Sequence, residues 1–279
     1  MSVRSFGMSQ PVTAPATSAP PGEVGFDPWR KLGWLLLPAL APTLLLAAWS
    51  ATVRFELVSP QVLVPPAKVA ATFARLLTTG ELARHLGRSL TRLAIGFGAG
   101  ATGGLALGIA MSTSKSVEAL VSPVFRLARQ VPTIALIPAL ILVFGVEETF
   151  KFVVVAKASF FPVALAAFEG VRQIPRAYLD VAAVNCLPTR VLVTKLLVPA
   201  TVPHVVAGVR TSLGRSWMIL VASELVAADS GLGQMMEMGR QMFRIDVVMV
   251  GVFITGAVGL ALDAGVRTVE RRLNQWQRA

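Results

Sequence analysis

Two ionisable side chains, Lys157 and Glu224, stand inside long apolar stretches of the sequence. If both stretches are membrane helices, Lys157 lies about 9 Å and Glu224 about 6 Å from the outer surface. A charge at that depth costs several kcal/mol unless it is paired or faces water. We therefore predict that the two side chains pair beside a watery path. Lys157 would give that path a positive potential suited to an anionic solute.

Each of these residues also has an ordinary explanation. Lys157 could extend its ammonium group to the membrane surface and have no further role. Glu224 could simply orient the turn formed by Gly231, Leu232 and Gly233. Both explanations stay open at the level of sequence.

A polar, basic segment, residues 168–203, separates two apolar blocks near the middle of the chain. Its prolines predict one helix over residues 176–187 and a second short helix that starts at Thr189 and is closed by Pro199. The segment holds more Arg and Lys than Asp and Glu, which predicts a cytoplasmic location. Such a helical pair would offer a docking surface to a soluble partner.

The composition indicates an integral membrane protein. Of 279 residues, 54% are hydrophobic and 15% are charged, and the mean hydropathy is +0.66. A water-soluble domain of this length carries more charge, so we predict an all-α protein with several membrane spans. The net charge of +11 fits cytoplasmic loops beside anionic lipid better than it fits a nucleic-acid partner.

Apolar stretches bounded by charged residues predict six transmembrane helices, with both termini in the cytoplasm. The expected spans are residues 29–54, 88–111, 132–146, 151–168, 204–228 and 247–266. Residues 1–28 lack periodicity and predict a disordered cytoplasmic tail. Residues 55–266 then form the core, and residues 267–279 form a second cytoplasmic tail.

Prolines and amphipathic patterns add detail to this outline. Pro132 and Pro138 predict that the third span is bent, a common feature beside a translocation path. Asp263 and Arg267 are expected to pair across one helical turn. Residues 68–77 predict an interfacial helix. Its apolar face would comprise Val69, Phe73, Leu76 and Leu77.

Glycines recur at a four-residue spacing along the second expected span. They are Gly96, Gly100, Gly104 and Gly108. Such a stripe allows two helices to approach closely in lipid. Part of it also fits the GxGxxG pattern of dinucleotide sites, but no strand precedes it, so helix packing is favoured.

The sequence carries no sign of catalysis or of a metal site. It lacks a Gly-Lys dipeptide, so it has no Walker A loop to bind nucleotide phosphates. Its single cysteine, Cys186, excludes an internal disulfide, and His85 and His204 lie far apart in sequence. A stand-alone secondary transporter or channel is the alternative class. It would need its own intramembrane ion site, for which Glu224 alone is weak support.

Segment 168–203 resembles the EAA loop of ABC importer permeases. That loop reads Glu-Ala-Ala, three residues, Gly, nine residues, then Ile-x-Leu-Pro. Asp180 stands here in place of the Glu, and Cys186 in place of the Gly. Because glycine permits a positive φ, cysteine there implies either an ordinary backbone or mild strain. The resemblance assigns ATPase coupling to Tyr178, Asp180, Ala182, Ala183, Cys186, Leu187, Leu196 and Pro199.

Two further stretches, residues 126–146 and 223–233, are similar to the nitrate, sulfonate and taurine branch of these permeases. The resemblance implies a MetI-like type I importer subunit in a bacterial inner membrane. It would work with a second permease subunit, expected to be an identical copy, and with two cytoplasmic ATPase subunits that bind ATP and Mg. An extracytoplasmic binding protein would select the solute, expected to be a small anion. No cofactor is expected in this chain itself.

Overall fold

The computed structural model describes residues 28–59 and 63–273, except for the side chains of residues 28–39, 179, 183 and 189. The chain divides into two compact units, Met1–Ala48 and Trp49–Ala279. Every regular element among the described residues is a helix, which confirms the all-α prediction. The expected tail, residues 1–28, lies outside the described residues except for Pro28.

Four helices in the described residues are long and apolar enough to cross a membrane. They are α3 (Glu81–Thr113), α6 (Glu148–Arg172), the stretch Leu192–Val226 that ends in α9 (Val198–Val226), and α11 (Ile245–Leu273). A bent pair of helices makes a fifth span if it is counted as one. The first expected span coincides with α1 (Pro28–Arg54), and the count of six stays a prediction.

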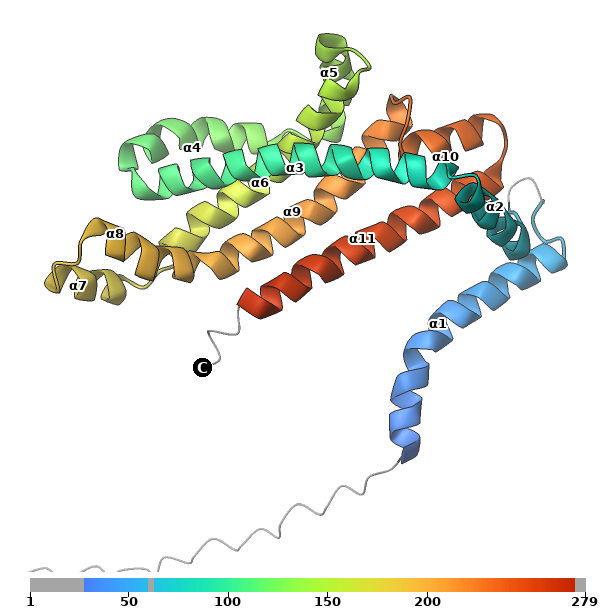
Figure 1. Ribbon diagram of the computed structural model, residues 1–279, viewed down its shortest axis with the longest axis horizontal. Helices are drawn as coiled ribbons and strands as arrows, with labels where there is room; N and C mark the ends of the chain where they lie inside the picture. The colour runs from blue at the N-terminus through green and yellow to red at the C-terminus, as the bar shows by residue number, and fades with distance from the viewer. Residues whose placement is uncertain (1–27, 60–62, 274–279) are drawn as a thin grey trace, which may run out of the picture. The chain divides into compact units, whose positions relative to one another are not determined.

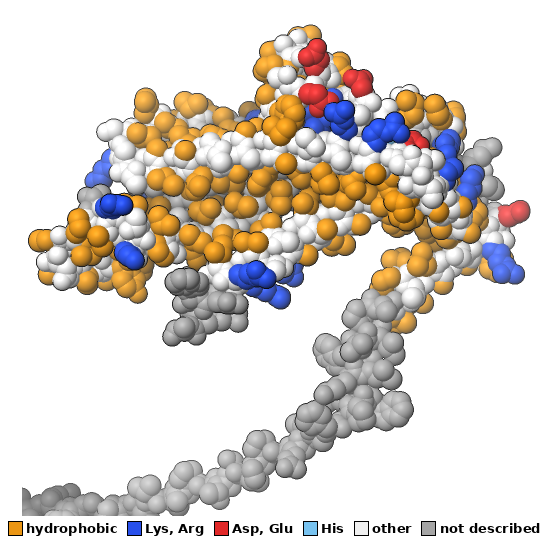
Figure 2. Space-filling view, viewed as in Figure 1, with side chains coloured by type: hydrophobic (Ala, Val, Ile, Leu, Met, Phe, Trp, Pro, Cys, Tyr) orange, Lys and Arg blue, Asp and Glu red, His pale blue; other side chains and the backbone are white. Residues whose placement is uncertain are grey.

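The core forms where α3, α6, α9 and α11 pack side by side (Figure 1). Leu93, Val155, Trp217 and Leu220 are buried together at the centre of this bundle. The Trp217 indole nitrogen donates to the backbone oxygen of Thr255 at 3.0 Å, which ties α9 to α11. Figure 2 shows hydrophobic side chains along the helices and charged side chains gathered toward their ends, as expected of membrane helices.

The glycine stripe of α3 lies against α6. A Cβ at Gly96 would lie 2.7 Å from the Cβ of Val155, and one at Gly100 would overlap the backbone of Ala156. Gly104 and Gly108 likewise face the α6 backbone. The four-residue spacing thus marks a seam at which two helices of the same chain approach closely.

The third expected span is not a single crossing helix. The region consists of α4 (Lys115–Gln130), a short 3-10 turn η1 (Ile134–Leu136) and α5 (Ile137–Phe144), with a bend of 83° at the break. Because α5 has only 8 residues, it is about 12 Å long and cannot cross a bilayer alone. The chain crosses here only if α4 and α5 together form one broken span.

The helix expected at residues 68–77 is α2 (Pro66–Thr78), and its interfacial location stays a prediction. Of its expected apolar face, Val69 and Leu76 are buried within the protein, whereas Phe73 and Leu77 are exposed. The buried face also includes Thr72, whose hydroxyl donates to Asp246 of α11 at 2.7 Å. A polar side chain can occupy this face because a carboxylate on the facing helix satisfies it.

Candidate functional site

The segment expected to couple to an ATPase forms two short helices at one end of the bundle, α7 (Arg176–Val184) and α8 (Thr189–Val191) (Figure 1). The first helix ends at Val184, three residues earlier than predicted. The reason lies in the backbone at Cys186, where φ is +48°. The Leu187 N–H donates to the backbone oxygen of Ala182 at 3.1 Å across this residue, as in a Schellman helix ending.

Cys186 therefore occupies the left-handed position that glycine favours in such an ending. Of the two possibilities left by the sequence, the structure shows the strained one. A cysteine in this conformation costs on the order of 1 kcal/mol relative to glycine.

The outer face of α7 is apolar although it is exposed. Tyr178, Val181 and Val184 follow one another at three-residue intervals and are 58%, 61% and 84% exposed. Asp180 is exposed beside them, while Ala182 is buried. An exposed apolar stripe next to a carboxylate is suited to contact with another protein. The side chain of Ala183 lies outside the described residues.

The second short helix does not end at Pro199 as predicted. α8 continues into a π-helical segment, η2 (Leu192–Leu197), and then directly into α9. The Val198 N–H donates to the oxygen of Val193, so the wider π turns precede the proline, which has no N–H to donate. Leu196 is half-buried and Pro199 is exposed on this continuous helix.

A cavity of about 570 Å³ lies between the end of α4, α6 and α9. Lys157 lines it from α6 and donates from Nζ to the backbone oxygen of Val131 at 2.8 Å and to the Thr133 hydroxyl at 3.4 Å. Nζ also lies 5.3 Å from the centre of the Phe161 ring. The ammonium group thus lies against the negative end of the α4 dipole and does not simply extend along lipid.

Two arginines line the same cavity, Arg129 from α4 and Arg215 from α9. Glu169 supplies a carboxylate to the lining. Of the two prolines expected beside a path, Pro132 precedes η1 and Pro138 lies in the first turn of α5. Neither is among the residues that line this cavity, although Thr133, next to Pro132, is.

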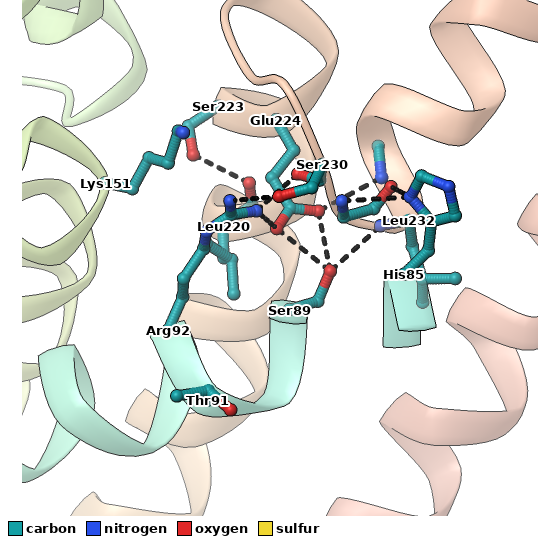
Figure 3. A network of polar contacts seen from close by, with 12 residues as sticks. His85, Ser89, Thr91, Arg92, Lys151, Leu220, Ser223, Glu224, Ser230 and Leu232 are labelled. Carbon is teal, nitrogen blue, oxygen red and sulfur yellow. Dashed lines mark hydrogen bonds and ion pairs between the residues drawn. The ribbon is translucent and has the colours of Figure 1, made fainter. Parts of the chain in front are cut away.

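The predicted pairing of Lys157 with Glu224 is wrong. Glu224 is 1% exposed and accepts from the Nη1 of Arg92 at 2.7 Å and from the Ser89 hydroxyl at 2.8 Å (Figure 3). The Gly233 N–H donates to the same carboxylate at 3.1 Å. Glu224 thus contacts the glycine turn, as the alternative expected, but it also forms an ion pair with Arg92.

Arg92 is the centre of this polar cluster. It donates to the Glu148 carboxylate through Nε at 2.6 Å and Nη2 at 2.5 Å, and to both the backbone oxygen and the hydroxyl of Ser230. Lys151 lies 3.5 Å from the same Glu148 carboxylate. The cluster therefore ties together α3, the start of α6, the end of α9 and the turn before α10 (Leu232–Gln241).

A second ion-pair group lies on α9 and α11. The expected pair of Asp263 with Arg267 is present at 2.9 Å. Arg210 of α9 also contacts Asp263 at 2.6 Å and Glu270 at 3.3 Å. The aspartate therefore joins two helices as well as stabilising its own.

Sequence reasoning missed Arg92, Glu148 and Arg215 as site residues. Arg92 could have been found from the sequence. Arg92 and Glu224 each lie inside an apolar span, and opposite charges in two spans suggest that the two helices meet. The partner of Glu224 could still not be chosen between Arg92 and Lys157 without the arrangement of the helices. Arg215 resembled a residue near the membrane surface until the length of its helix was known.

Residues 100–275 match the protein family described as binding-protein-dependent transport system inner membrane component. The chain belongs to this family. It is thus a multi-pass permease subunit of an ABC importer and not an enzyme. The predicted membership is confirmed.

Relatives of this permease cover most of its length. A Bacillus subtilis protein, SsuC, described as an aliphatic sulfonates transport permease, is 36% identical over 89% of this chain and 90% of its own. The taurine transport system permease protein TauC of Escherichia coli is 32% identical over 83% of this chain and 86% of its own.

A solved structure supports the fold. A chain of the MetNI methionine ABC transporter, in an inward-facing conformation, aligns with a TM-score of 0.55 over 67% of the permease and 95% of that chain. Their sequence identity is 19%, so the likeness concerns the fold alone. It confirms the predicted MetI-like architecture.

Proposed function

We propose that the permease imports a small organic or inorganic anion, of the sulfonate, taurine or nitrate type, and that α7 and α8 couple it to an ATPase. The observation that carries the coupling part is the exposed apolar stripe on α7. Tyr178, Val181 and Val184 would pack against the ATPase, with Asp180 beside them. Exposed apolar side chains at the basic end of a membrane protein are otherwise unfavourable in water.

The assembly that follows from this proposal has several subunits. Two copies of the permease would flank the path, and two cytoplasmic ATPase subunits would bind ATP and Mg. An extracytoplasmic binding protein would deliver the solute. The segment α7–α8 and both chain termini would lie in the cytoplasm, because Arg and Lys are concentrated in that segment and next to the first and last expected spans.

The anionic class of the solute has two sources of support. The relatives named above are described as permeases for aliphatic sulfonates and for taurine. In addition, the cavity beside Lys157 carries three cationic side chains against one carboxylate. A cationic cavity favours an anion and disfavours a cation of similar size.

The test is uptake by liposomes that contain the permease, its copurified ATPase and its binding protein. Taurine, ethanesulfonate and nitrate are supplied in turn, with ATP or a non-hydrolysable analogue inside. We expect at least one anion to accumulate only with hydrolysable ATP. Accumulation by the permease alone under an ion gradient would instead indicate a stand-alone secondary transporter.

A further inference from the structure

Two cationic side chains lie near the middle of the membrane and line the same cavity. Lys157 is about 14 Å along α6 from its first residue, and Arg215 is about 16 Å along α9 from its last residue. Half of a bilayer core is about 15 Å thick. If the outer ends of both helices lie at the membrane surface, both residues lie near the midplane, the depth at which secondary transporters bind their solutes.

Unlike the buried Arg92, these two cations have no carboxylate partner among the residues that the structure describes. Arg92 and Arg210 each contact two carboxylates. Arg215, by contrast, makes no ion pair with any residue that the structure describes, and Lys157 donates only to neutral oxygens. An unpaired charge at the midplane is costly in lipid. It is stable where it faces water or an anion.

The shape and lining of the cavity favour an anion with a short apolar part. Thr211 adds a hydroxyl one helical turn before Arg215, and Phe161 and Ile219 provide apolar walls. Glu169 also lines the cavity, but it lies about 18 Å along α6 from Lys157. At that distance its carboxylate is screened by water and leaves the potential near Lys157 positive.

We propose that Lys157 and Arg215 together bind the oxyanion group of the transported solute, in the cavity between α4, α6 and α9. This site rests on the proposed import of an anion and names the residues that would recognise it. Lys157 has a third N–H beyond the two used toward Val131 and Thr133. The guanidinium of Arg215 offers a planar set of donors that matches a sulfonate or carboxylate.

The first experiment measures the local potential on the permease alone. In a Cys186→Ser background, Thr211→Cys places a thiol on the exposed lining of the cavity. The quantity measured is the ratio of two labelling rates, that of an anionic methanethiosulfonate reagent, which itself carries a sulfonate, over that of a cationic one. This ratio should be about tenfold higher than in the double variant Lys157→Gln/Arg215→Gln. Ethanesulfonate should slow the reaction in the parent background only.

Two further cysteine positions serve as controls, one outside the cavity and one on its lining. Thr78→Cys, exposed at the end of α2, should show the same reagent ratio with or without the two cations. Ala207→Cys provides a second probe position on the cavity lining. A ratio at Thr211→Cys that does not change when both cations are removed would overturn the proposal. The proposal would also be overturned if neither reagent labels Thr211→Cys or Ala207→Cys, because the cavity would then not be open to water.

The second experiment uses the complete transporter. Lys157→Gln and Arg215→Gln should each lower anion uptake about tenfold, the contribution of one charged hydrogen bond, while Arg75→Gln on α2 should not. ATP hydrolysis by the variants should persist. If the thiol test succeeds but no anion is transported by the parent, the anion site stands and the proposed function fails. Unchanged uptake in both variants would contradict the site.

Discussion

At the scale of single residues, the carboxylate of Asp180 is the group to test first. It lies exposed on α7 beside the apolar stripe, at the position where the EAA loop that this segment resembles has a longer glutamate. Asp180→Lys should abolish ATP-driven uptake, because it reverses the charge that would face the ATPase, while membrane insertion stays normal. Asp180→Glu should keep uptake and serves as the matched control. Full uptake by the lysine variant would exclude this residue from coupling.

Arg92 and Glu224 allow a test of a buried charge pair. Arg92→Met leaves the carboxylate of Glu224 without its cation inside the bundle, and should destabilise the permease by about 3–5 kcal/mol. The double variant Arg92→Met/Glu224→Leu should recover part of that loss, since the uncompensated charge is gone. Thermal unfolding in detergent, followed by the fluorescence of the tryptophans, measures both.

An exposed ion pair provides the comparison for this experiment. Arg240 and Glu237 pair at 2.5 Å on the surface of α10, so Arg240→Met should change the melting temperature little. Equal losses for Arg92→Met and Arg240→Met would show that the buried cluster contributes no more than a surface pair.

At the scale of elements, the seam between α3 and α6 depends on the absence of side chains. Gly100→Leu should prevent close packing, because even a Cβ at this position overlaps the Ala156 backbone. The variant should lose yield and monodispersity in detergent. Gly98→Leu is the matched control on the same helix, since a Cβ there meets nothing within 4 Å. Similar behaviour of the two variants would count against a tight seam.

The turn between α7 and α8 gives a test in the opposite direction. Cys186→Gly should stabilise the isolated permease by up to about 1 kcal/mol, because glycine adopts a positive φ without strain. Cys186→Val should destabilise it, since a branched Cβ is least compatible with φ of +48°. If neither variant changes the melting temperature, the backbone of the turn can adjust to either side chain at little cost in stability.

At the scale of the whole molecule, the fold could be predicted from the sequence wherever a residue pattern is compatible with only one structure. Repeated apolar stretches predicted membrane helices, and the spacing of Gly96 to Gly108 predicted the seam with close packing. Patterns with two meanings were misjudged. A proline can end a helix or follow a π-helical segment, and at Pro199 the chain continues through η2.

Partner choice was the other limit, for a physical reason. Depth in the membrane could be estimated for Lys157 and Glu224 from the rise per residue. The direction in which each faces depends on which helices are neighbours, and that is set by packing far along the chain. Arg92 reaches Glu224 because α3 packs beside both the start of α6 and the end of α9. Single-sequence patterns do not contain that order.

The unbroken helix from Leu192 to Val226 also has a mechanical consequence. Its 35 residues make a rod about 52 Å long, with the docking helices at one end and Glu224 near the other. A tilt of about 10° around its centre would displace the two ends by roughly 4–5 Å in opposite directions. A displacement of α8 would thus tilt the whole helix. Because Glu224 near its other end is bonded to Arg92, the Arg92 cluster would move with the same helix.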